Sequence, residues 1–300
     1  ENPGTQTPPE QNPEDSAADS QPVDNSQPPA GSASGVMDTV EDYLALLDES
    51  QISPEKRTSI QNRLETMDME EIADKFNSDE KDFVIDGTTV TGYTGIGGYI
   101  KIPDQITAIG DGAFAGNNTI LGVSFPGALQ SIGSSAFNGC TNLEAVAIPD
   151  SVTSVGDSAF ANCTALANVS IGAGTGTIAS NEFNNCSSLQ SVAVPEGISS
   201  IGAGAFGNCA NLGSVSLPST LASLDRNAFA GDVNLASISV ASGSYSSYDG
   251  CVYTADGSQL LLCPQGKTGI AFSPEMAAIA SGAFSGCGYL LSAVVPDATD

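Results

Sequence analysis

Residues 141–163, TNLEAVAIPDSVTSVGDSAFANC, form one unit of a repeat that determines the fold of this 300-residue chain. The units on either side keep the same apolar positions, and one phenylalanine returns every 23 residues. Periodicity of this length is typical of a solenoid, in which each coil buries its apolar face against the next. The phenylalanines at this position are Phe114, Phe137, Phe160, Phe183, Phe206 and Phe229, and Phe284 follows 55 residues later.

Within each unit, alternation of larger apolar residues with small ones predicts a short strand. Val146 and Ile148 alternate with alanines, so we expect these two side chains in the core and the alanines at the surface. Pro149 follows directly and ends the strand, because proline has no N–H to donate to a neighbouring strand. A second short extended segment and a turn then bring Phe160 into the core. Coils stacked at about 4.8 Å would share one continuous interior.

The positions shared by the units carry a recognisable pattern. I-P-x-x-V-x-x-I-G-x-x-A-F-x-x-C, followed by L-x-x-V-x-I-P, resembles the BspA-like leucine-rich repeat family over about residues 82–300. Residues 249–268, DGCVYTADGSQLLLCPQGKT, are similar to the hairpin insertion that often precedes a further repeat in that family. The resemblance implies an α+β solenoid of BspA-type 23-residue repeats, with short parallel strands stacked in a right-handed coil. An N-terminal helical cap and a β-hairpin insertion at about 243–267 complete the predicted fold.

Composition divides the chain into three parts. Residues 1–35 are rich in proline and acids and contain no base, which predicts a disordered tether; an ordinary frayed terminus is the alternative. Over residues 36–80 apolar residues such as Val36, Val40 and Tyr43 recur at helical spacing, which predicts a small helical N-terminal domain or cap. Residues 81–300 form the predicted leucine-rich repeat solenoid.

The charge balance excludes several classes of function. Eight Lys and Arg stand against 35 Asp and Glu, giving a net charge of -27, so we expect no nucleic-acid partner and no binding to an anionic membrane surface. The chain has no histidine, which removes the commonest general base and metal ligand. We therefore expect no catalytic residue, no metal and no cofactor. No stretch reaches the roughly 20 apolar residues of a transmembrane span.

The seven cysteines fall into two groups. Five recur at the repeat position and are expected to be buried, reduced thiols that pack as small apolar side chains. Cys251 and Cys263 instead flank Asp256-Gly257, a strong hairpin turn signal, at nearly equal distances. A disulfide between Cys251 and Cys263 is one hypothesis, and two free thiols are the other. The five repeat cysteines are Cys140, Cys163, Cys186, Cys209 and Cys287.

Candidate ligand-binding residues lie at outward strand positions and around the insertion. Most outward positions carry Gly, Ala or Ser, which leaves few of the aromatic and arginine side chains that dominate interfaces. Tyr99, Lys101 and Asn168 are the larger residues on this face. The tyrosines of the insertion are either ligand anchors or a cover for the open hairpin, and the two interpretations weigh about evenly. These tyrosines are Tyr245, Tyr248 and Tyr253.

The resemblance implies a non-catalytic, bacterial cell-surface or secreted protein that mediates adhesion or recognition. Its implied partners are host or extracellular-matrix proteins, or a surface glycan. The resemblance also implies export, with a signal peptide that has been removed and a lipid anchor on an N-terminal cysteine missing from this sequence; the start at Glu1 rather than Met agrees with removal of an N-terminal peptide. A passive surface spacer is the main alternative. A glycan-acting enzyme that uses paired carboxylates is a weaker one.

Overall fold

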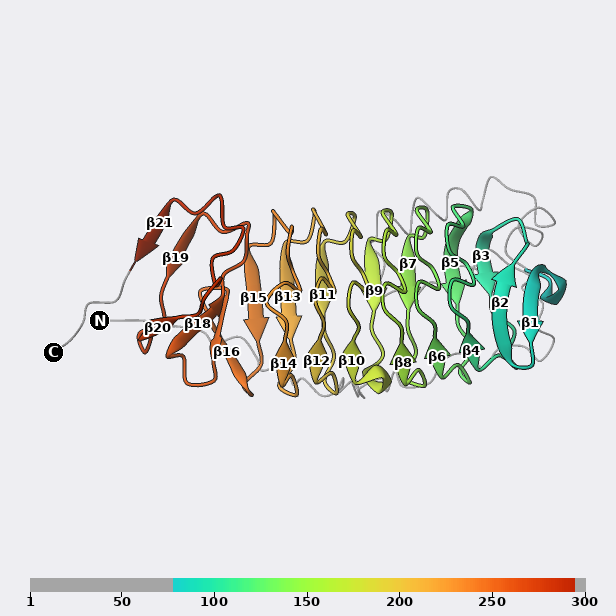
Figure 1. Cartoon of the computed structure of the whole chain (residues 1–300), viewed down its shortest axis with the longest axis horizontal. Coiled ribbons are helices and arrows are strands. Elements are labelled where there is room, and N and C mark those ends of the chain that lie inside the picture. Colours follow the sequence, from blue (N-terminus) through green and yellow to red (C-terminus); the bar gives the residue numbers. More distant parts are fainter. Residues whose placement is uncertain (1–77, 295–300) are drawn as a thin grey trace, which may run out of the picture. The chain divides into compact units, whose positions relative to one another are not determined.

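The computed structural model describes residues 78–294. The repeat folds as predicted into a β-solenoid of about nine turns of ~23 residues. Each regular coil contributes one strand of two residues and one of three to five, and the strands form two parallel rows in Figure 1. Because the described residues contain only strands and two short 3-10 helices, this part of the chain is a β-solenoid and not the predicted α+β fold.

The first row contains the two-residue strands. Most pair in parallel with the equivalent strand 23 residues later, as Ser131 does with Ser154 and Ile132 with Val155. The pairing is interrupted between the strands Ser154–Val155 and Thr177–Ile178, so the row consists of two sheets. In β4, β6, β10 and β12 the first side chain is partly or fully exposed and the second is buried, so the row seals one side of the core. Its strands are β4 (Ala108–Ile109), β6 (Ser131–Ile132), β8 (Ser154–Val155), β10 (Thr177–Ile178), β12 (Ser200–Ile201) and β14 (Ser223–Leu224).

The second row carries the L-x-x-V-x-I segment of each unit. Its strands also pair in parallel, and proline follows most of them, at Pro126, Pro149, Pro195 and Pro218. The prolyl carbonyl accepts the N–H three residues on, for example from Val152 at 3.0 Å, so each strand ends in a tight turn. The strands are β3 (Gly98–Lys101), β5 (Ile120–Ser124), β7 (Ala145–Ala147), β9 (Asn168–Ser170), β11 (Ser191–Ala193), β13 (Ser214–Leu217) and β15 (Ser237–Val240). A 3-10 helix, η2 (Ala173–Thr175), follows β9 where Gly172 replaces the proline.

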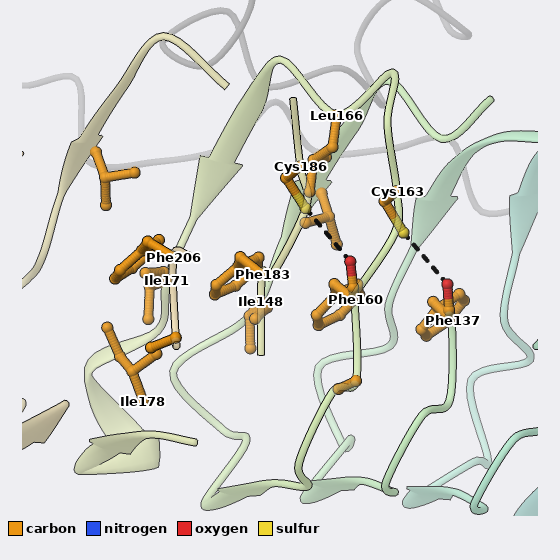
Figure 2. Close-up of a cluster of buried hydrophobic side chains, with 14 of the residues drawn as sticks. Phe137, Ile148, Phe160, Cys163, Leu166, Ile171, Ile178, Phe183, Cys186 and Phe206 are labelled. Atoms are coloured by element: carbon orange, nitrogen blue, oxygen red, sulfur yellow. Dashed lines mark hydrogen bonds between the residues drawn. The ribbon is translucent and has the colours of Figure 1, made fainter. Parts of the chain in front are cut away.

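The core contains the predicted column of phenylalanines. From Phe114 to Phe229 the six rings stack face to face with centroids 4.7, 5.2, 5.5, 5.5 and 5.7 Å apart and planes within 8° of parallel. Phe137, Phe160 and Phe206 are all fully buried. Figure 2 shows rings of this column side by side among the aliphatic side chains of the coils. The spacing of the rings follows the strand spacing, so the backbone repeat holds each ring against the next.

Four of the five repeat cysteines, Cys140, Cys163, Cys186 and Cys209, lie beside this column as buried, free thiols, as predicted. Each of these four donates its S–H to the carbonyl of a phenylalanine 26 residues earlier, for example Cys163 to Phe137 at 3.2 Å and Cys186 to Phe160 at 3.3 Å (Figure 2). Cys287 in the last coil is also a free thiol but is only half-buried. Cys287 donates instead to the Cys263 carbonyl at 3.3 Å. Burial raises the pKa of the Cys140 thiol to about 12. The thiol column therefore satisfies one carbonyl per coil inside an apolar core, which leaves no thiolate for chemistry there.

The coils approach one another closely at the turn before each phenylalanine. A Cβ on Gly156 would lie 2.4 Å from the Ser134 nitrogen, and one on Gly133 would lie 2.6 Å from the Asp111 nitrogen. Real Cβ atoms do not approach backbone so closely, so these coils require glycine there.

The N-terminal end of the described solenoid is closed by an antiparallel hairpin, β1 (Phe83–Asp86) with β2 (Thr89–Tyr93), and β2 pairs in parallel with β4. A capped 3-10 helix, η1 (Glu80–Asp82), precedes β1. The tether predicted for residues 1–35 lies outside the described residues, and so does the helical domain predicted for residues 36–80 except for its last three residues. Because residues 78–294 contain no α-helix, the structure gives the helical cap no support.

The regular stack is interrupted after β15. Three antiparallel strands, β16 (Tyr245–Tyr248), β17 (Cys251–Thr254) and β18 (Gln259–Leu262), occupy the interval in which the sequence predicts a hairpin insertion. The last coil then adds β19 (Gly269–Ala271), β20 (Ala278–Ile279) and β21 (Ser292–Val294), where β20 pairs with β18 and β21 with β19. These strands stand at the opposite end of the row from β1 and β2 in Figure 1.

Candidate binding surface

The outward face of the second row is a regular surface of the solenoid. In-register pairing aligns Ser191 with Ser214 and Ser237. The same pairing aligns Ala193 with Ser216 and Ser239. Ser191, Ala193, Ser214, Ser216 and Ser239 are exposed, whereas the residues between them, such as Val192 and Val215, are buried. The side chains of this serine-rich face, β11, β13 and β15, are short and uncharged, so a partner can approach its backbone closely.

The candidate residues at the first coil are only partly accessible. Tyr99 is 7% exposed, and its ring lies over Gly122, where a Cβ would meet the ring at 2.5 Å. Its hydroxyl donates to a carboxylate oxygen of Glu144 at 3.3 Å. Lys101 is exposed and forms an ion pair with Asp104 at 3.4 Å, and Asn168 is half-buried on β9. Tyr99 therefore packs into the structure, whereas Lys101 on the first coil and Asn168 three strands further along the row keep partly or fully accessible polar groups.

The tyrosines of the insertion have three different environments. Tyr253 is fully buried, and its hydroxyl accepts the Ser273 N–H at 3.3 Å. Tyr245 is half-buried and uses its hydroxyl to complete the edge of β14, accepting from the Leu224 N–H at 3.1 Å and donating to the Ala222 carbonyl at 3.3 Å. Tyr248 is 42% exposed. Only Tyr248 therefore presents much of its ring to a partner, and Tyr253 cannot contact a ligand without unfolding of the insertion.

The structure does not gather the candidate residues into one site. Tyr99 and Lys101 lie on β3 at one end of the second row, whereas Tyr245 and Tyr248 lie on β16, beyond its other end (Figure 1). Asn168 lies between them on β9. A single ligand that touches all of these residues would have to span most of the stack.

Cys251 and Cys263 are free, buried thiols in this structure. Val252 pairs with Leu262 across the antiparallel strands β17 and β18. Cys251 precedes Val252 and Cys263 follows Leu262, so the two cysteines occupy the next pair of facing positions. A hydrogen bond between the two thiols, together with burial, raises the pKa of Cys263 far above its usual range. The thiols are therefore neighbours, in the arrangement that the turn signal predicts.

Two buried carboxyls were not predicted from the sequence. Glu182 and Asp232 are 1% and 0% exposed. Burial raises the pKa of each to about 8, with the charge of Asp157 adding to the effect on Glu182. Glu182 accepts the Ala179 N–H and Asp232 the Cys209 N–H, both at 2.7 Å.

These carboxyls stand at repeat positions that other coils fill with Ala and Cys, so the sequence signal was a departure from the repeat. They lie two coils apart, and both are almost completely buried. They therefore do not form the carboxylate pair that a glycan-acting enzyme would use. Among residues 78–294 no group of three acid or sulfur ligands is placed to hold a metal ion.

Comparisons with known proteins decide the family. The chain matches the BspA type leucine rich repeat region in six copies over residues 97–186 and 176–300. The chain belongs to this family. A search of curated proteins finds no match.

The solved structures it resembles are bacterial leucine-rich repeat proteins. A T. pallidum leucine rich repeat protein, TpLRR, is 25% identical, with a TM-score of 0.51 over 72% of this chain and 91% of that chain. A leucine rich cell surface protein from Faecalibacterium prausnitzii A2-165 is 24% identical, with a TM-score of 0.48 over 73% and 76%. The pneumococcal vaccine antigen PcpA is 24% identical, with a TM-score of 0.46 over 75% and 50%. The first of these supports the solenoid fold over most of both chains.

No helix within residues 78–294 is long and apolar enough to cross a membrane. Leucine-rich repeat solenoids typically bind proteins, and their extended surfaces are made by the stacked strands. The serine-rich face is the surface of this kind that the described residues offer.

Proposed function

We propose that this protein is a non-catalytic binding protein, exported to the bacterial cell surface or secreted, and that it recognises a protein partner through the serine-rich face. The observation that carries the proposal is the in-register, exposed and uncharged face of β11, β13 and β15. Family membership supports a surface role, and the net charge of -27 disfavours nucleic acid and anionic membranes as partners.

Partner chemistry follows from the face itself. The serine-rich face carries closely spaced hydroxyls and small side chains, so the backbone or a flat surface of a partner can approach it closely. The face has no charged side chain that a partner would have to neutralise. We propose a host or extracellular-matrix protein, with a surface glycan as the alternative of the same chemistry. Lys101 and Asn168 extend the polar surface toward the first coil, and Tyr248 is the exposed aromatic anchor at the other end.

The direct test is a binding array of matrix proteins and mucus glycans probed with the full chain and two variants. Ser214→Arg/Ser216→Arg places two long charged side chains on the serine-rich face. Gln130→Arg adds the same side chain at an exposed position beside the first row and serves as the control. The proposal expects the double variant to lose binding and the control to keep it. Equal binding by both variants would remove this face from the account.

A passive spacer is a second candidate, favoured by the scarcity of aromatic and arginine anchors on the serine-rich face. In that case the same array gives no bound partner for any of the three proteins. We propose that the acidic, proline-rich residues 1–35 would then hold the solenoid away from a lipid-anchored N-terminus. Surface labelling of intact cells, before and after mild protease treatment, tests this arrangement.

We further propose that Cys251 and Cys263 form a disulfide after export. In exchange with an external disulfide such as oxidised glutathione, the glutathione S–S bond breaks and the Cys251–Cys263 bond forms, and the two electrons and two thiol protons pass to the two glutathione thiols that are released. Counting thiols by mass spectrometry on protein isolated without reductant tests this, with five free thiols and one 251–263 linked peptide expected. Seven free thiols would contradict the proposal.

A further inference from the structure

On the side of the first row, strand pairing is interrupted between β14 and β20, and a gap lies there beside the insertion. In the regular coils a backbone N–H of one coil reaches the carbonyl of the next at the turn, as from Ser158 to Ser180 at 3.0 Å and from Asn181 to Ala203 at 2.9 Å. The same position in the last coil is Ser281. Its carbonyl is reached instead by a guanidinium nitrogen of Arg226, at 3.0 Å. A side chain thus spans a distance that backbone groups cover elsewhere.

This gap forms an open cavity of about 200 Å³. Apolar side chains from both sides of the interruption line it, and Arg226 and Ser281 stand beside them. A volume below that of drug-sized ligand sites suits a single amino-acid side chain. The apolar lining residues are Leu224, Tyr245, Leu261, Leu262 and Ala280.

Arg226 differs from the other basic residues in the described part of the chain. The other bases of the described part, Lys81, Lys101 and Lys267, each pair with an aspartate, whereas Arg226 forms no ion pair with any acid in residues 78–294. A guanidinium has five N–H donors, and the bond to Ser281 uses one. The equivalent positions of other coils hold Asp111, Ser134, Asp157, Ser180 and Ala203, so no structural need of the repeat explains an arginine.

The edge of β14 offers a backbone acceptor in the same place. In the preceding coil the Ile201 carbonyl accepts the Asp225 N–H of the next coil at 3.0 Å. The corresponding N–H after the gap, that of Ala280, goes to Leu260 at 2.8 Å instead. No donor in the described part of the chain therefore reaches the Leu224 carbonyl, which by the repeat geometry faces the gap.

We propose that this gap binds the C-terminal residue of an extended peptide. The residue's N–H would donate to the Leu224 carbonyl, its apolar side chain would fill the space between Leu261 and Ala280, and its carboxylate would accept from Arg226. Strand addition at a sheet edge and capture of a terminal carboxylate are established modes of peptide recognition. Charge-assisted bonds from arginine to a carboxylate supply the specificity for the chain end. The gap is separate from the serine-rich face, so the proposal does not depend on that surface.

The test compares N-acetyl-L-leucine with its neutral isostere N-acetyl-L-leucinamide, using ligand-observed saturation-transfer NMR on the full chain. We expect millimolar binding of the acid and at least about tenfold weaker binding of the amide. Arg226→Ala copies the alanine that the preceding coil carries at position 203, so it should fold and should bind the acid at least about tenfold more weakly. Ala280→Leu should fill the cavity and abolish binding while Arg226 remains.

Thermal unfolding of both variants, matched to that of the unaltered chain, shows that the fold is intact. A tripeptide ending in leucine should bind more tightly than N-acetyl-L-leucine if the β14 edge contributes. Equal binding of acid and amide, unchanged binding by Arg226→Ala or no binding of the acid at millimolar concentration would each overturn the proposal.

Discussion

The regular coils and the C-terminal part share one repeat but differ in packing. In the regular coils the phenylalanine rings stack in parallel and are almost completely buried. In the last coil Phe284 is only half-buried and meets Phe272 edge to face at 6.4 Å. Ile279 and Leu291 there are 49% and 87% exposed. A coil of a solenoid is thus stabilised by two neighbours, and the last described coil has one.

The insertion explains where the difference begins. β18 of the insertion pairs with β20, where a regular stack would pair β14 with β20. Apolar residues of the insertion and of the last coil form a second core around Tyr253, Leu260 and Ile270. The stacked ring column ends at Phe229. The break in sheet pairing and the break in the core therefore coincide, and the hydroxyl of Tyr245 completes the exposed strand edge.

The largest predicted effect contrasts the two cores. Phe160→Ala removes a ring stacked on both sides in a fully buried site and should lower the free energy of unfolding by ~3–5 kcal/mol. Phe284→Ala removes a half-buried ring and should cost no more than about 2 kcal/mol. Urea unfolding followed by circular dichroism measures both. Equal losses would contradict the distinction between the two parts.

The second prediction concerns Asp232, where an acid replaces the repeat cysteine. Its pKa is raised to about 8 in the folded chain, so between roughly pH 4 and pH 8 the folded state holds a proton that the unfolded state has lost. Stability from this group is complete below its unfolded pKa and decreases as pH rises toward 8. Asp232→Cys restores the column and should gain at least about 2 kcal/mol more at pH 8 than at pH 5.

Urea unfolding of both proteins at the two pH values measures this difference. Glu182 and the large net charge affect the pH dependence of stability alike in the unaltered chain and in Asp232→Cys. Their contributions therefore cancel when the two proteins are compared. A gain that is the same at pH 5 and pH 8 would show that the Asp232 carboxyl is ionised in the folded chain.

The third prediction tests the capped edge of β14. Tyr245→Phe removes the hydroxyl that bonds Leu224 and Ala222 and should destabilise the chain by ~1–2 kcal/mol. Tyr248→Phe is the matched control, because this exposed hydroxyl has no hydrogen-bond partner in the described part of the chain. Thermal unfolding separates the two, and equal midpoints for the two variants would remove the structural role of Tyr245.

The smallest effect is expected on the serine-rich face. Ser216→Ala changes an exposed side chain and should alter the free energy of unfolding by less than about 0.5 kcal/mol. Val215→Ala, on the buried side of the same strand, should cost several times more. Chemical denaturation measures both losses. A larger loss for Ser216→Ala than for Val215→Ala would show that Ser216, and not Val215, lies on the buried side of β13.

The repeat made most of the regular coils predictable. The 23-residue spacing gives the phenylalanine column, the inward valines and the buried thiols, because each coil meets the same surroundings as its neighbour. The insertion occurs once, so no second copy reveals which of its residues face inward. Burial of Tyr253 and the role of Tyr245 depend on contacts with Ser273 and Leu224, which sequence spacing does not show.

The departures from the repeat carried more information than the residues chosen as binding candidates. Arg226 and Asp232 stand at positions whose occupants in other coils are known from the sequence, yet their effects depend on the gap and on burial. Glu182 likewise replaces an alanine. A substitution within a repeat can therefore be identified from the sequence, whereas its consequence requires the structure.

The central claim, that the regular coils share one continuous core which ends at the insertion, is tested most directly by native hydrogen exchange of the full chain. Peptides from residues 106–238 should exchange slowly and as a group, because their amides bond from coil to coil around a common core. Peptides from residues 269–294 should exchange faster. Uniform protection from residue 78 to residue 294, or fast exchange scattered among the regular coils, would contradict the claim.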